Sequence, residues 1–110
     1  MKLYRLYTGP DQQSHFEKLE DTATKQWLDT VHPVTGLLFR TEARPHILKW
    51  HNAPRRQWVI TLAGSVEIGL GDGSWATFGP GDVFLAEDLT GQGHIAKPTN
   101  WVRAFIHIEE

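Results

Sequence analysis

Residues 57–82, QWVITLAGSVEIGLGDGSWATFGPGD, decide the fold class. The stretch consists of short runs of β-branched and aromatic residues, which suit the pleated surface of a sheet, and turns rich in Gly and Asp separate these runs. Asp72-Gly73 is a strong hairpin signal because both positions tolerate positive φ. The pattern predicts strands over 57–62, 66–70, 75–78 and 83–86. We expect the first two to form a hairpin that turns at Ala63-Gly64.

The same pattern continues outward in both directions. Alternating or short apolar runs bounded by turns predict further strands over 2–7, 14–19, 37–41, 46–51, 93–96 and 101–108. Only residues 14–28 have the length for a helix, and their apolar positions keep no period of 3.6. Turns at intervals of about ten residues are typical of a sandwich or barrel rather than of βαβ units. The sequence therefore predicts an all-β fold.

Length and composition indicate one globular domain over residues 1–110. The chain is 40% hydrophobic and 22% charged, and its 11 basic residues are scattered with a net charge of −2, so we expect no nucleic-acid binding. The absence of Cys excludes disulfides, thiolate metal sites and a cysteine nucleophile. The start, MKLYRLYTGP, lacks the apolar run of a signal peptide, and no apolar run is long enough to cross a bilayer. We expect a cytoplasmic protein without membrane contact.

Two motifs in the second half of the chain carry a family resemblance. His51, Gln57 and Gly64 stand at the first His, the Glu and the final Gly of the pattern G-x5-H-x-H-x3–4-E-x6-G. Gly81 begins the pattern G-x5-P-x-G-x2-H-x3-N, and His94 is the candidate for its histidine. The chain thus resembles the cupin superfamily, and within it a group of small cupins without assigned activity. This resemblance implies an antiparallel jelly-roll β-barrel with a small-molecule pocket inside.

The departures from the cupin motifs concern metal binding. The resemblance implies a metal site of three His and one Glu, but Ala53 stands at the second His place and Gln57 at the Glu place. His51 and His94 remain, and Gln57 adds only a neutral amide oxygen, which is a weak ligand. We expect a pocket that works without a metal. The alternative is a divalent metal such as Fe, Mn, Ni or Zn, held by His51, His94 and Gln57.

The candidate catalytic residues are His51, His94 and Gln57. Two histidines that face one cavity are able to act as general acid and general base near neutral pH, and Gln57 would orient the substrate. The alternative for each His is a core residue whose ring nitrogens hydrogen bond to the backbone or to Gln57. Histidines buried in cores are normally satisfied in this way.

Glu87 and Asp88 are further candidates for the site. They lie in a polar stretch before His94, where a carboxylate would assist proton transfer or accept a hydrogen bond at the mouth of the pocket. Solvated loop carboxylates are the alternative, and so is an ion pair with Arg55 or Arg56. If either arginine is free, it would instead bind a substrate carboxylate through two parallel hydrogen bonds.

Three functions fit these residues. The first is a metal-independent isomerase, epimerase or lyase that acts on a small polar molecule, a sugar or an organic acid. The second is a binding or sensing module without turnover, since one cupin-like barrel serves many chemistries. The third is a metal-dependent oxygenase with a reduced ligand set. Whether the chain is an enzyme is left open by the sequence.

The strand over 57–62 is apolar on both faces. Trp58, Ile60 and Leu62 alternate with the residues expected to face the interior, whereas a half-exposed antiparallel strand shows one polar face. Either the N-terminal segment or a second subunit must cover this outer face. We expect a homodimer, formed by sheet packing or by exchange of an N-terminal strand.

Overall fold

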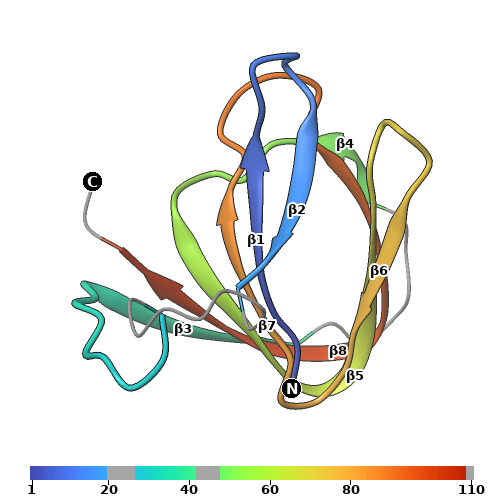
Figure 1. Cartoon of the computed structure of the whole chain (residues 1–110). Coiled ribbons are helices and arrows are strands. Elements are labelled where there is room, and N and C mark those ends of the chain that lie inside the picture. The colour runs from blue at the N-terminus through green and yellow to red at the C-terminus, as the bar shows by residue number, and fades with distance from the viewer. Residues whose placement is uncertain (20–26, 42–47, 109–110) are drawn as a thin grey trace.

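The computed structural model describes residues 1–19, 27–41 and 48–108 and consists of eight strands (Figure 1). The strands are β1 (Leu3–Thr8), β2 (Ser14–Lys18), β3 (Gly36–Thr41), β4 (Leu48–His51), β5 (Gln57–Gly69), β6 (Trp75–Phe78), β7 (Val83–Glu87) and β8 (His94–His107). No residue in the described ranges is helical, which confirms the all-β prediction. Within those ranges there is accordingly no helix long and apolar enough to cross a membrane. The first two residues of the strand expected over 46–51 lie outside the described residues.

All eight strands belong to one mixed sheet. The strand order is β2-β1-β7-β5-β8-β3, with β4 also paired to β8 and β6 also paired to β5. β1 runs parallel to β7, so the expectation of a purely antiparallel sheet is wrong. The physical reason is that β1 and β7 lie far apart in the sequence, and no tight hairpin forces them to run in opposite directions. In the described part of the chain, β2 and β3 end the sheet without pairing, so the expected barrel is not closed.

β5 and β8 are long continuous strands where the sequence predicted two pairs of shorter ones. They pair from Gln57 opposite His107 to Gly69 opposite Ile95, and the register shifts near Gly64. Gly64 has φ +67° and Asn100, which lies across from it, has φ +47°. The expected hairpin at Gly64 is therefore wrong. This glycine forms a β-bulge that bends the ladder, because a side chain there would collide with the backbone of Asn100.

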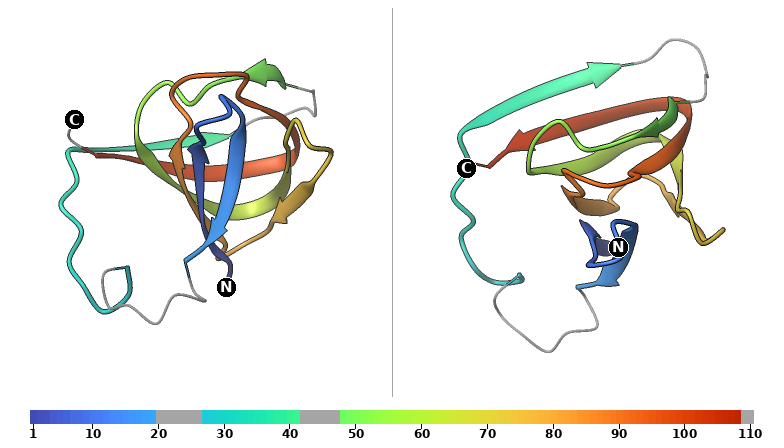
Figure 2. Two further views of the ribbon diagram at one scale, coloured as in Figure 1. Left: turned by 45° about the horizontal axis from the view of Figure 1, so that its top comes forward. Right: turned by 90° about the horizontal axis from the view of Figure 1, so that it is seen from above.

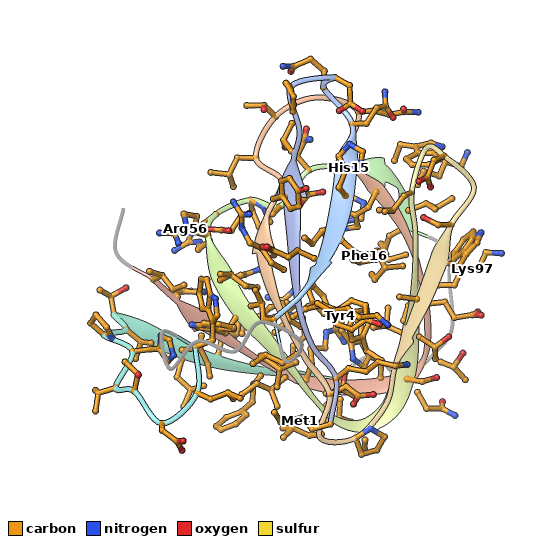
Figure 3. The ribbon with its side chains drawn as sticks, viewed as in Figure 1. Met1, Tyr4, His15, Phe16, Arg56 and Lys97 are labelled. Carbon is orange, nitrogen blue, oxygen red and sulfur yellow. The ribbon has the colours of Figure 1, made fainter. Side chains whose placement is uncertain are left out.

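The bent sheet encloses an inner core between β1–β2 and the second half of β5 with β6 (Figures 1 and 2). Figure 3 shows Tyr4 and Phe16 pointing from β1 and β2 into this space. Their rings lie 5.5 Å and 6.2 Å from that of Phe78 on β6, centroid to centroid. Phe78 is fully buried. Aromatic packing across the bend therefore holds the two layers together.

A second, smaller core lies on the outer face of the sheet. Trp58, 8% exposed, packs there with Leu3, Leu19 and Leu85, and Trp27 lies against them. The N-terminal part of the chain thus covers Trp58, which is one of the two covers expected for the outer face of this strand. The neighbouring part of the same face is open.

We predict that Gly64→Ala lowers the free energy of unfolding by about 3 kcal/mol, because it adds both backbone strain and a collision with Asn100. Gly73→Ala is the matched control. Gly73 also has positive φ, at +88°, but a Cβ there meets no atom within 4 Å. We expect about 1 kcal/mol for the control. Urea unfolding followed by tryptophan fluorescence measures both values, and equal losses would contradict a close approach at Gly64.

Candidate functional site

A cavity of about 310 Å³ opens on the inner face of the sheet, between β3, β4, β5, β7 and β8. Its volume is at the lower end of the range for small-molecule sites. Most of its wall is apolar, and the larger apolar side chains are Leu48, Val59, Ile68, Phe84, Trp101 and Phe105. The polar side chains that reach it from the described residues are Arg40, His51, Gln57, His94 and Arg103. Three of these five, His51, Gln57 and His94, are candidates from the sequence.

His51 and His94 face each other across the β4–β8 ladder. They are register partners, and their ring centroids lie 4.4 Å apart. His51 Nδ1 lies 2.7 Å from the carbonyl oxygen of Lys49, which only accepts hydrogen bonds, so Nδ1 carries the proton. His94 Nδ1 donates in the same way to Asp88 Oδ2, at 2.6 Å. When the rings are neutral, each therefore keeps an Nε2 lone pair for a ligand.

Asp88 is fully buried behind His94. Its Oδ2 accepts hydrogen bonds from His94 Nδ1 and, at 2.7 Å, from the hydroxyl of Ser14, which is itself buried. Among the described residues, Oδ1 makes no hydrogen bond. A carboxylate on Nδ1 fixes the tautomer and direction of an imidazole and compensates the charge that the ring gains when Nε2 takes a proton. The sequence placed Asp88 at the mouth of the pocket, whereas the structure places it behind the ring.

Gln57 begins β5 and is only 6% exposed. Its side chain lines the cavity beside the two histidines, and no residue of the described ranges hydrogen bonds to its amide. A buried amide without a protein partner offers one acceptor and two donor hydrogens to a bound molecule. This arrangement fits the orienting role that the sequence suggested.

Glu87 does not reach the cavity. Because successive side chains of a strand point to opposite faces, Ala86 lines the cavity and Glu87 points outward. Its two oxygens accept hydrogen bonds from Arg5 Nε at 2.5 Å and from Arg56 Nε at 2.6 Å. Of the alternatives weighed for Glu87, the structure has the ion pair with Arg56, which lies on the outer side of the sheet (Figure 3). These bonds tie β1 to β7 and to the loop before β5.

Arg40 and Arg103 line the cavity and were not singled out from the sequence. They are register partners on β3 and β8 and point to the same face. Arg103 is 3% exposed, donates to the carbonyl of Trp101 at 2.9 Å and stacks 4.3 Å above its ring. Arg40 is exposed at the cavity mouth. The alternation of residues 101, 103 and 105 was the available signal, since Trp101 and Phe105 share the inner face with Arg103.

The donors that the described residues bring together are two imidazole nitrogens and one neutral amide. Within the described ranges, no group of three or more His, Cys, Asp or Glu side chains is arranged to hold a metal ion. Asp88 does not complete a set with His51 and His94, because its Oδ2 is bonded to Nδ1, on the side of the ring away from the free nitrogen. Protein zinc sites use at least three such ligands, so these residues fit a resident metal poorly.

Comparisons with protein-family models, with curated proteins and with solved structures find no match to this chain. The chemistry of the site is therefore inferred from its own residues.

We predict that His51 and His94 are both Nδ1–H tautomers when neutral, as detected by long-range ¹H–¹⁵N NMR. Asp88→Leu removes the acceptor of His94 without adding a polar group, so His94 should lose this preference while His51 keeps it. Ser14→Ala, which removes the other partner of Asp88, should leave the His94 tautomer unchanged. An Nε2–H tautomer for His94 in the unmodified protein would contradict the geometry of the site.

Proposed function

We propose that the chain is a small cupin, a jelly-roll protein whose inner face holds a small-molecule pocket. The gathering of the motif residues His51, Gln57 and His94 around one cavity supports this assignment. The Gly64 bulge and the positive φ of Gly81 fit the glycine places of the two motifs. A crystal structure is expected to have two facing layers around this cavity, and a flat sheet would contradict the assignment.

The proposed reaction is a metal-independent proton transfer within a small molecule, an isomerisation, epimerisation or elimination. The observation that carries this proposal is the pair of anchored imidazoles whose Nε2 atoms are left for one cavity. His94, supported by Asp88, would take a proton from the carbon next to a carbonyl group. His51 would give a proton to the oxygen, and Gln57 would hold the substrate in place.

The spacing of the rings favours an isomerase among these three. With centroids 4.4 Å apart, His51 and His94 reach neighbouring atoms on one side of a bound molecule. Movement of a proton between adjacent carbon and oxygen atoms needs this arrangement. An epimerase that uses two groups needs them on opposite sides of the carbon, which register partners on adjacent strands do not provide.

The arginines favour an organic acid over a sugar as the substrate. Arg40 at the mouth and Arg103 in the wall present guanidinium N–H groups, whose fixed planar geometry matches a carboxylate. A volume of about 310 Å³ holds a molecule of few carbons. The aromatic wall would contact the carbon chain of the acid.

We expect the protein to exchange the α-protons of one or more small oxo or hydroxy acids with solvent D₂O, which NMR detects without knowledge of the product. His94→Gln should slow this exchange by about 100-fold or more. His15→Gln is the control, since His15 pairs with Asp11 at the surface and lies outside the cavity. Exchange that survives both His51→Gln and His94→Gln would exclude these histidines as the acid and base.

The same experiment separates the alternative functions. Saturable binding of an acid without exchange would indicate a binding or sensing module. Exchange or turnover that appears only with added Fe(II), Mn(II), Ni(II) or Zn(II) would indicate a metal-dependent enzyme with a reduced ligand set.

We predict that Arg40→Gln weakens binding of the exchanged acid by about 10–100-fold, because a charge-assisted hydrogen bond is lost. The neutral amide of the same acid should lose little affinity. Calorimetric titration of both compounds checks this, and an equal loss for acid and amide would show that Arg40 does not recognise the carboxylate.

A further inference from the structure

The outer face of the sheet is open and apolar at the β3 end. Phe39 is 64% exposed, Leu37 58% and Leu62, on β5, 46%. Leu37 and Phe39 are the register partners of Ile106 and Ala104, whereas Arg40, one residue on, lines the cavity. Leu37 and Phe39 thus point away from the cavity, on the outer side of a strand that lies at the edge of the molecule (Figure 2).

A hollow of about 340 Å³ adjoins these side chains on the same face. Its wall includes Trp27, Val34, Trp58 and Ile60 and is almost entirely apolar. Its polar group, His32, already pairs its Nε2 with the carbonyl oxygen of Trp27 at 2.8 Å. An open apolar hollow beside a row of exposed apolar side chains marks a binding surface rather than scattered surface residues.

The residues on this face select the occupant. From β3, β5 and β8 the outer face presents Leu37, Phe39, Ile60, Leu62, Val102, Ala104 and Ile106, none of which is charged. A two-fold interface brings the same patch onto itself, so a charged patch would repel its copy and this one does not. A surface that binds a membrane is flanked by Lys and Arg, whereas the two arginines of these strands, Arg40 and Arg103, line the cavity on the other face.

Knob and hollow also occur on one and the same face. Phe39 is the most exposed aromatic side chain on it, and the hollow has room for a phenyl ring. Aromatic side chains seated in apolar pockets supply most of the affinity at the centre of protein interfaces. In a two-fold dimer each copy provides one Phe39 and one hollow, so two such contacts form at once.

We propose that a second copy of this chain docks on this face, with Phe39 of each protomer seated in the hollow of its partner. A stable dimer of ordinary size buries about 800 Å² on each protomer. The row of apolar side chains and the hollow together supply the apolar centre of such an interface. The cavity with His51 and His94 opens on the opposite face, so the dimer leaves it accessible and this proposal does not rest on the proposed reaction.

Sedimentation velocity should show the unmodified chain as a dimer. We expect Phe39→Asp to be monomeric and Phe39→Ala to raise the dimer dissociation constant about 30-fold or more. Trp75→Asp is the matched control, because Trp75 is an exposed aromatic residue on β6, outside this face. It should stay dimeric. A monomeric unmodified protein, or a dimer that Phe39→Asp leaves intact, would overturn the proposal.

Cross-linking tests the face even where Phe39→Asp fails to fold. The chain has no Cys, so single-Cys variants report one contact each. Phe39→Cys chains mixed with Val34→Cys chains should form a mixed disulfide pair under mild oxidation, because Val34 lines the hollow. Phe39→Cys mixed with Trp75→Cys should not. Equal yields from the two mixtures would overturn the proposed contact.

Discussion

The bend in the β5–β8 ladder is the constraint on which the rest of the structure depends. Side chains of a regular strand alternate, so residues 94 and 101 of β8 would point to opposite faces. Both His94 and Trp101 line the cavity, because the bulge at Gly64 and Asn100 shifts the alternation between them. One continuous pair of strands thereby supplies two walls. The glycine is needed because the backbone at Asn100 occupies the space of its side chain.

The site depends on a few polar contacts set in an apolar wall. The bonds from Ser14 and His94 to Asp88 join β2, the end of β7 and the start of β8. Removing any partner of such a buried group leaves a polar atom unsatisfied, at a cost of about 1–3 kcal/mol. The same contacts that hold three segments together also orient His94. Stability and the proposed chemistry therefore place the same demands on Asp88.

Period-two alternation predicted the strands and their inner residues well, but it has no way to signal a bulge. A glycine with positive φ serves a hairpin turn and a bulge equally, so Gly64 was assigned to a turn that does not exist. Glu87 and Asp88 were grouped as loop carboxylates. Continuing the alternation of Ala86 past the end of β7 would have separated them, since Asp88 shares the inner side and Glu87 does not. Arg40 was missed because its inward direction follows only from its pairing with Arg103.

The central claim is that His51 and His94 work as acid and base and do not hold a metal, because the described residues bring them no third ligand. Elemental analysis of the protein, expressed without a histidine tag, tests this most directly when a His51→Ala/His94→Ala variant is measured beside it. The account predicts divalent metal far below one equivalent per chain, with no change in the variant. Near one equivalent in the unmodified protein that disappears in the variant would contradict it.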